Sequence, residues 1–248
     1  MLFRSSLSIF GQRNAIYLLG GGSGISFNYY LTDSLELAGT YVTGAGANIE
    51  DGEGLFMGDY SVLGQLTWTP SPQFNLAFTY LNSYYKAGNF AFGDGSSISL
   101  GGTSIANNLN GLRDDFAVEA NAYGIETFFH LSPQVALSGW VGFTDVNLVK
   151  AGDGEIWNYG ATLVFPDLGK EGSLGALIFG AQPTLRGLDV PGSKLEKRDF
   201  AYHFEAFYKF QMNDNISITP GIFWLPSLNQ DSKNDDLFIW VVRTTFSF

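Results

Sequence analysis

Apolar and polar residues alternate along many short stretches of this chain. In residues 236–248, DLFIWVVRTTFSF, the even positions from 238 onward carry Phe, Trp, Val, Thr, Phe and Phe, whereas the odd positions from 241 onward carry Val, Arg, Thr and Ser. Because the side chains of a β-strand point alternately to its two faces, this spacing predicts a strand with one apolar face and one mixed face.

Similar strands recur along the chain, joined alternately by short and long connections. Tight turns are predicted at residues 31–34, 70–73, 131–134, 166–173 and 212–215, where Asn, Asp, Pro, Ser and Gly gather. Long polar loops are predicted at residues 43–58, 85–115, 147–155, 184–199 and 226–236. This alternation predicts an antiparallel up-and-down meander with its long loops at one end. Counting a partial strand near the N-terminus, we expect about twelve strands.

The faces of these strands indicate a transmembrane barrel. In residues 59–69, Tyr60, Val62, Leu66 and Trp68 share one face, and Gln65 lies on the other. In residues 200–211, one face carries Phe200, Tyr202, Phe204, Ala206, Tyr208 and Phe210, and the opposite face carries Ala201, His203, Glu205, Phe207, Lys209 and Gln211. Aromatic residues near both ends of a strand are typical of the interfacial girdles of membrane barrels. Since strands in lipid must form a closed sheet, about twelve is a lower bound for the barrel.

One strand departs from this regularity. In residues 117–130, Glu119 and Glu126 fall on positions of opposite parity. We therefore predict a β-bulge near Gly124.

Composition supports a barrel and excludes several other classes. Aromatic residues make up 16% of the 248 residues and charged residues only 15%, and no apolar run is long enough for a spanning helix. The net charge of -11 argues against nucleic acid as a partner, and the absence of cysteine excludes thiolate chemistry. Residues 1–14 do not resemble a signal peptide, so for an exported protein we expect further sequence ahead of this chain.

Three stretches resemble a known family. Residues 52–85, 215–230 (NISITPGIFWLPSLNQ) and 235–248 are similar to cyanobacterial outer-membrane porins, called iron uptake porins, of the carbohydrate-selective OprB-type superfamily. The terminal Phe248 is similar to the C-terminal signal by which outer-membrane barrels are recognised for insertion. The resemblance implies that residues 1–248 are one porin domain, the C-terminal part of a barrel of about sixteen strands, without the signal peptide and S-layer-homology region of the family. It also implies a location in the outer membrane and raises a homotrimer as an expected assembly.

The predicted function is passive diffusion of small hydrophilic solutes or inorganic ions through a water-filled barrel. The family name implies iron or other inorganic ions as solutes, whereas the superfamily name implies sugars, and no residue of the sequence decides between the two. An alternative is a non-conducting β protein that anchors the envelope or binds glycans. We expect Gln65, Glu205 and Lys209 to face water inside the barrel. The residues expected to face lipid are Leu66, Trp68, Phe204 and Phe210.

Residues 86–115 form a long insert rich in Gly, Ser and Asn, with little apolar content for a core of its own. Two interpretations are open: the insert folds into the barrel or over its mouth, or it is a disordered external loop. In the first case Arg113, Asp114 and Asp115 would lie near the narrowest part of the pore, where charge selects among solutes. The net charge of -11 then predicts weak cation selectivity, with Asp114, Asp115 and Glu205 contributing most.

Few residues suggest other chemistry. The two histidines, His130 beside a short turn and His203 near a long loop, are expected at opposite rims, as ordinary wall residues rather than metal ligands. The carboxylates of residues 49–54 and 231–236 do not match the spacing of an EF-hand loop and are interpreted as solvated turns. No serine stands in a nucleophile-elbow pattern, so we expect no enzymatic activity and no cofactor.

Overall fold

The computed structural model describes residues 6–44, 46, 54–55, 57–93 and 99–247. It contains one antiparallel sheet of eleven strands in which sequence order and spatial order coincide, so the predicted all-β meander is confirmed. The strands are β1 (Ser23–Thr32), β2 (Leu35–Thr43), β3 (Tyr60–Ser71), β4 (Phe74–Tyr85), β5 (Val118–Ser132), β6 (Val135–Leu148), β7 (Gly152–Pro166), β8 (Leu174–Asp189), β9 (Tyr202–Asn213), β10 (Ile216–Leu225) and β11 (Leu237–Phe246). The prediction made for the terminal Phe248 concerns a residue that lies outside the described ones.

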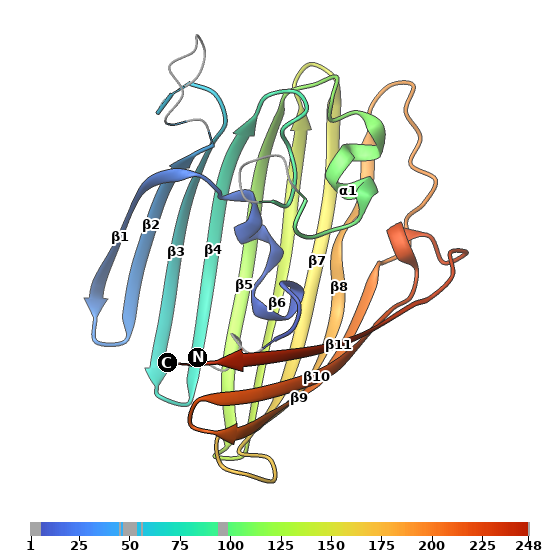
Figure 1. The fold of residues 1–248 in the computed structure, drawn as a ribbon. Helices are drawn as coiled ribbons and strands as arrows, with labels where there is room; N and C mark the ends of the chain where they lie inside the picture. The colour runs from blue at the N-terminus through green and yellow to red at the C-terminus, as the bar shows by residue number, and fades with distance from the viewer. Residues whose placement is uncertain (1–5, 45, 47–53, 56, 94–98, 248) are drawn as a thin grey trace.

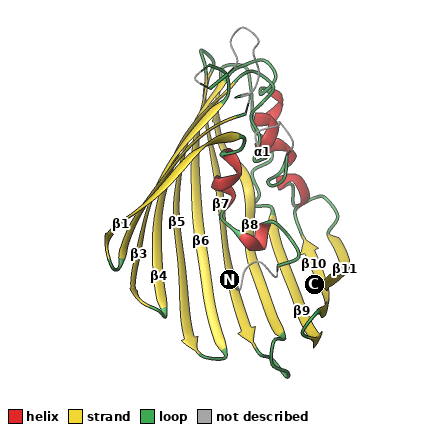
Figure 2. Cartoon of the chain, turned by 60° about the vertical axis from the view of Figure 1, so that its left-hand side comes forward, coloured by secondary structure: helices red, strands yellow, loops and turns green. Residues whose placement is uncertain are grey.

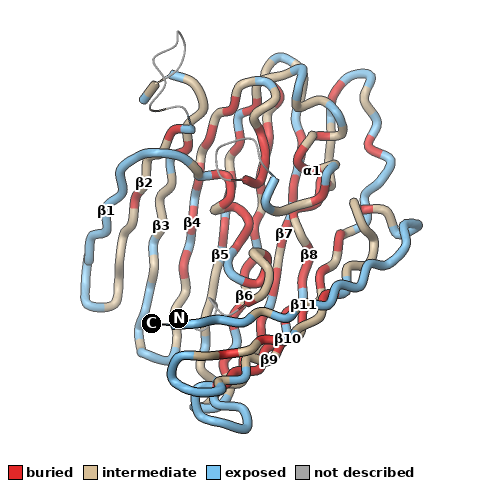
Figure 3. The backbone as a smooth tube through the Cα atoms, viewed as in Figure 1, coloured by how far each residue is buried: buried red, intermediate tan, exposed pale blue. Residues whose placement is uncertain are grey.

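The sheet is strongly curved, and the helical segments lie on its inner side (Figure 1, Figure 2). We call this side the concave face. Strands β1 and β11 are the two edges, and within the described residues each pairs on one side only. Figure 3 shows both edges as exposed along most of their length, whereas buried residues concentrate on β4 to β8. The described sheet is therefore an open trough, with the curvature of a barrel wall.

The five predicted tight turns all connect neighbouring strands at one end of the sheet, and the longer connections lie at the other end (Figure 1). Two predicted loops are wrong in part: residues 184–189 of the loop predicted at 184–199 belong to β8, and the loop predicted at 147–155 is shorter than expected. Within residues 147–155, Asn147 pairs with Asp153 and Leu148 with Gly152, so only residues 149–151 form the turn. Lys150 and Gly152 adopt positive φ angles of 68° and 149°, the left-handed geometry that lets a short connection reverse the chain.

The segment before β1 is not the partial strand that the sequence suggested. Its described residues include two 3-10 helices, η2 (Phe10–Gln12) and η3 (Ala15–Leu19). The Asn14 side chain accepts a hydrogen bond from the Ile16 backbone N–H and so caps the second helix. Ile16 and Leu19 are buried against the concave face, so this segment gains more by packing inside the trough than by adding an edge strand.

The bulge predicted near Gly124 is absent. Gly124 pairs with Thr79 of β4 on one side and with Gly142 of β6 on the other, and the register does not shift at either pair. The irregularity of β5 lies at its end, between His130 and Ser132. The two glutamates of β5 simply occupy opposite faces. In the described part of the chain, no helix is long and apolar enough to cross a membrane.

Candidate functional site: the concave face and the segments folded against it

The outer face of the sheet is apolar and exposed. Large side chains there have exposed fractions typical of surface residues: Trp68 45%, Phe78 49%, Tyr123 50% and Phe210 41%. Aromatic rings stack across neighbouring strands, as Tyr60 does with Tyr84 and Trp224 with Phe238. A sheet that exposes its aromatic face and buries its polar face has the polarity of a wall facing lipid.

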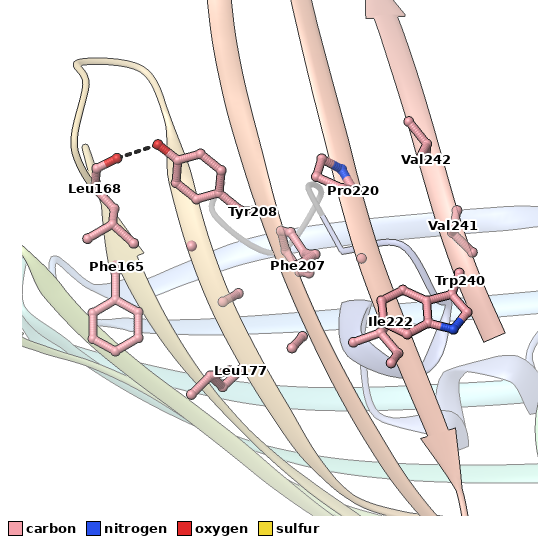
Figure 4. A pocket seen from close by; sticks show the side chains of 14 residues that line it. Phe165, Leu168, Leu177, Phe207, Tyr208, Pro220, Ile222, Trp240, Val241 and Val242 are labelled. Atoms are coloured by element: carbon pink, nitrogen blue, oxygen red, sulfur yellow. Dashed lines mark hydrogen bonds between the residues drawn. The ribbon is translucent and has the colours of Figure 1, made fainter. Parts of the chain in front are cut away.

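The outer face also contains an apolar hollow of about 500 Å³ (Figure 4). Ile222 and Trp240 line it from β10 and β11, and Leu168 and Tyr208 line it on the β7 to β9 side, where the Tyr208 hydroxyl donates a hydrogen bond to the Leu168 carbonyl at 2.7 Å. The small residues Gly175 and Ala206 leave room for it. Because its lining is almost entirely hydrocarbon, it does not suit a hydrophilic solute.

The concave face is occupied by the segment of residues 6–22, which we call the inner segment (Figure 1). Its main anchor is Asn14, which is only 1% exposed. The Asn14 amide donates to Glu126 Oε1 at 2.8 Å and to the Val141 carbonyl at 3.1 Å, and its oxygen accepts from Asn158 Nδ2 at 2.7 Å. One side chain thus ties the inner segment to β5, β6 and β7.

Glycines of the wall make room for the inner segment. A Cβ atom at Gly124 would overlap Ile16, and one at Gly221 would overlap Leu7. A Cβ atom at Gly180 would lie 2.9 Å from the Phe10 ring and would also overlap the backbone of β7. The inner segment therefore follows a track of inward-facing glycines from β5 to β10.

A second cluster of polar side chains surrounds Tyr17. The Tyr17 hydroxyl oxygen lies 2.9 Å from Thr79 Oγ1 and accepts a hydrogen bond from Gln65 Nε2. Thr79 donates to Glu126 Oε2 at 3.2 Å. Burial, followed by the nearby Glu126 carboxylate, raises the pKa of Tyr17 above its ordinary value. The hydroxyl therefore stays protonated near neutral pH, and the group keeps its full set of donors.

The other end of the inner segment is held by Glu205 on β9. Its carboxylate accepts from the Leu7 backbone N–H at 2.9 Å and from the hydroxyls of Ser6 and Ser8. His203 Nε2 lies 3.5 Å from Glu205 Oε2. On β11, Arg243 donates to the Ser6 carbonyl at 3.0 Å. Charge-assisted bonds of this kind are about twice as strong as neutral ones, so the inner segment is fixed at both ends.

The described part of the insert, residues 86–93 and 99–115, packs against the concave face. Phe90 and Phe92 are fully buried, as is Leu109 after the short helix α1 (Ser104–Asn108). They share one apolar cluster with Ile16 of the inner segment and Leu185 of the wall. The insert therefore folds inward, and its few apolar residues do form a core, which the Gly, Ser and Asn content concealed.

Gln230, in the connection between β10 and β11, links the insert to strand β8. It is completely buried; its oxygen accepts from Thr103 Oγ1 at 2.9 Å and from the Leu185 backbone N–H at 3.0 Å. Its amide donates to the carbonyls of Leu185 and Lys197. Neither Gln230 nor Asn14 is predictable from the sequence, because single amides in polar stretches carry no local signal of burial.

The residues predicted to line a pore are distributed as follows. Gln65 and Lys209 occupy concave-face positions, while Glu205 and His203 lie on the same face beneath the inner segment, 2% and 3% exposed. Arg113 and Asp114 form an ion pair at 2.9 Å with the Asp114 side chain 72% exposed, and Asp115 is also exposed. Leu66, Trp68, Phe204 and Phe210 lie on the outer face.

The two histidines do not form a metal site. His203 packs against Phe10 at 4.4 Å between ring centroids, and His130 packs against Phe128 at 4.7 Å. Among the described residues, no group of three or more His, Asp or Glu side chains is arranged to hold a metal ion. Most of the acidic turn predicted at residues 49–54 lies outside the described residues.

Comparisons with known proteins agree with this geometry. The model of the family described as "Carbohydrate-selective porin, OprB family" matches residues 3–248. "Uncharacterized protein alr4550" of Nostoc sp. is 38% identical over 252 residues, covering 98% of this chain and 42% of the relative. "Uncharacterized protein sll0772" of Synechocystis sp. is 32% identical over 260 residues, covering 97% of this chain and 46% of the relative. The chain thus spans less than half the length of these two relatives.

Proposed function

This chain belongs to the OprB family of carbohydrate-selective porins, and on that premise we propose that it forms the C-terminal part of an outer-membrane barrel that passes small hydrophilic solutes by diffusion. The observation that carries the proposal is the reversed polarity of the sheet. Trp68 and Phe210 are exposed on the outside, whereas Glu205 is buried on the inside. Such a wall is stable where lipid lies outside and polar groups lie within.

The rest of the barrel would come from other strands of the whole protein. The edges β1 and β11 are unpaired on their outer sides within the described residues, and both relatives are more than twice as long as the matched region. We propose a closed barrel of about sixteen strands, since every backbone group in a bilayer must be paired. Residues 1–248 would then be one part of a single porin domain.

Sugars are the solute class that we propose, and the family description is what supports it. Inorganic ions would also pass through a water-filled opening, and no feature of the described residues favours iron. Porins are non-enzymatic channels, so no reaction is assigned to this chain, as the sequence led us to expect. A homotrimer is a further proposal, which the mass of the native complex in detergent would test.

Conductance tests the proposed function directly. The whole protein, purified from outer-membrane fractions in detergent, should give discrete conductance steps in planar bilayers. A competing function, a non-conducting protein that anchors the envelope or binds glycans, is favoured by the two segments that fill part of the concave face. A protein that is monodisperse without detergent and gives no conductance would favour that competing function and eliminate the porin.

A further inference from the structure

The apolar hollow of Figure 4 continues into a second hollow on the outer face. The second hollow has a volume of about 420 Å³ and shares Leu177, Ala206 and Ile222 with the first. It extends the same surface to Leu137 on β6 and Ala161 on β7. Together the two hollows form one continuous track across β6 to β11, which we call the outer groove.

Small residues create the groove. Gly175 on β8 and Ala206 on β9 both line it. A Cβ atom at Gly175 would lie 2.8 Å from the Leu168 side chain, so even one methyl group there would intrude on the lining. The larger side chains of Tyr208 and Trp240 stand beside these small residues (Figure 4). The outer wall is therefore hollowed at this place, and a concave surface can hold one ligand in a fixed position.

The lining matches a ligand without polar groups. It is almost entirely hydrocarbon, and the Tyr208 hydroxyl already donates to the Leu168 carbonyl. A protein partner would bring polar groups of its own, because protein interfaces carry about one hydrogen bond per 100–200 Å². The groove offers almost no partners for such groups. An acyl chain needs none, and it gains the close van der Waals packing that stabilises contacts inside a bilayer.

A cation lies at one end of the groove. Lys170 is exposed on the turn between β7 and β8, two residues after Leu168 of the lining. Its Nζ atom lies 5.4 Å from the centroid of the Phe210 ring and donates to the Met212 carbonyl at 2.9 Å. An ammonium group has three donors, so two remain for a ligand. In the part of the chain that the structure describes, Lys170 forms no ion pair.

This end of the sheet has the features of a membrane interface. Trp68, Phe74 and Phe129 form an aromatic row there, packed edge-on at 6.0 Å and 6.1 Å between ring centroids. Such rows stand at the boundary between lipid tails and head groups in membrane barrels. A lysine at this level keeps its ammonium group among the head groups while its stem contacts apolar surface. The groove therefore leads from the hydrocarbon region to the Lys170 ammonium at its boundary.

We propose that the outer groove binds one acyl chain of a phospholipid of the surrounding membrane, and that Lys170 binds the phosphate of the same lipid. The phosphate oxygens accept charge-assisted hydrogen bonds from Nζ, while the chain packs over Ala206. Two carboxylates share the turn with this lysine. Asp167 accepts from the Gly172 backbone N–H at 2.7 Å, whereas Glu171 is exposed next to Lys170 and opposes an anion. This inference rests on the membrane location in the proposed function.

The test is native mass spectrometry of the whole protein, released from detergent after incubation with dioleoyl-phosphatidylglycerol. Diacylglycerol with the same two chains is the control lipid, because it lacks the phosphate. Ala206→Phe fills the groove, and its matched control is Val62→Phe, at an outer-face position of β3 that is 44% exposed. Lys170→Gln removes the cation, and its matched control is Lys150→Gln, at an exposed residue of a turn at the opposite end of the sheet.

The wild-type protein should retain one phosphatidylglycerol molecule per chain and bind diacylglycerol about tenfold more weakly. Ala206→Phe should weaken the binding of both lipids about tenfold. Lys170→Gln should weaken only the binding of phosphatidylglycerol, to the level of diacylglycerol. Glu171→Gln should strengthen phosphatidylglycerol binding about twofold, since it removes a neighbouring negative charge. Both control variants should bind lipid as the wild type does, and unchanged single-channel conductance shows that each variant has folded.

A conducting protein that retains no phosphatidylglycerol, or that retains it equally in Ala206→Phe and Lys170→Gln, would overturn the lipid site and leave the porin standing. If Ala206→Phe changed the number of chains in the complex and left the bound lipid unchanged, the groove would be a contact between subunits, and the lipid site would again be overturned. A protein that neither conducts nor binds lipid would overturn the proposed function together with this inference.

Discussion

Gly124 of β5 lies directly against Ile16 of the inner segment, so closely that a Cβ atom on the glycine would overlap the isoleucine. Ile16 is fully buried at this contact. The absence of a side chain at position 124 is therefore what admits the inner segment to the wall. The glycine serves close packing, not the bulge that the alternation of Glu119 and Glu126 suggested.

Gly124→Val should push the inner segment away from the wall, because overpacking costs about 1–3 kcal/mol. The chain lacks cysteine, so a reporter thiol at Ala15, which is 8% exposed, can be labelled alone. Its reaction rate with a small water-soluble thiol reagent should rise about tenfold in Gly124→Val. Gly64→Val is the matched control, because a Cβ there meets nothing within 4 Å. Equal rates in the two variants would contradict the packing role of Gly124.

Asn14→Ala should release the same segment by removing its polar anchor. The change removes the acceptor of the buried Asn158 amide and the donor to Glu126 Oε1, at about 1–3 kcal/mol for each polar group left unpaired. With the thiol at Ala15 as reporter, labelling should accelerate at least as much as in the glycine variant. Gln12→Ala removes a neighbouring side chain without a hydrogen bond and should leave the rate unchanged. Slow labelling in Asn14→Ala would show that apolar packing alone holds the segment.

The wall of this protein is readable from its sequence because strand periodicity is local. Alternation at period two separated Gln65 from Trp68 and Glu205 from Phe210, and the structure places each on the expected face. The tight turns were also found, since Asn, Asp, Pro and Gly set their geometry within four to eight residues. These features depend only on neighbours in the chain.

The filling of the concave face is not readable in the same way. Phe90, Phe92 and Leu109 are scattered among Gly, Ser and Asn, and they become a core only because distant strands supply the other half. Asn14 and Asn158 form a hydrogen bond although they are 144 positions apart in the sequence. No local sequence pattern at either residue predicts the other as its partner. The inner segment was therefore misread as a partial strand.

Phe90→Ala should loosen the insert. Phe90 is fully buried, and its ring packs edge-on against Tyr85 and Phe92 at centroid distances of 5.5 Å and 5.9 Å. Truncation to alanine should therefore lower the free energy of unfolding by about 3–5 kcal/mol. If the insert narrows the passage, single-channel conductance should increase. Leu100→Ala, at a position that is 40% exposed, is the control and should have little effect. Unchanged conductance in Phe90→Ala would show that the insert lies outside the conducting path.

Single-cysteine labelling should separate the two faces of the wall. Cysteines replacing Gln65 and Lys209 should react with a membrane-impermeant reagent that is small enough to enter the passage. Cysteines replacing Leu66, Trp68, Phe204 and Phe210 should be protected by lipid. At Glu205 the reaction should be slow as well, because residues 6–8 cover this position. Fast reaction at Leu66 and Trp68 with protection at Gln65 would reverse the assignment of the faces.

Ion selectivity should depend more on the exposed carboxylates than on the buried one. Asp114 and Asp115 are exposed, whereas Glu205 is 2% exposed and already compensated by the donors of Ser6, Leu7 and Ser8. Negative groups beside an aqueous passage raise the local concentration of cations, which predicts weak cation preference for a chain of net charge -11.

Neutralising Asp114 and Asp115 together should therefore move the reversal potential under a salt gradient toward zero. The permeability ratio should change by about twofold or less, because screening limits each charge to about 8–10 Å at physiological ionic strength. Glu205→Gln should have a smaller effect, and Glu119→Gln on the outer face should have none. If the wild-type channel prefers anions, or if selectivity survives neutralisation of all three carboxylates, the charges that decide selectivity lie elsewhere in the barrel. The outward-facing aromatic wall would be unaffected by that result, since it depends on the lipid boundary and not on the charge of the passage.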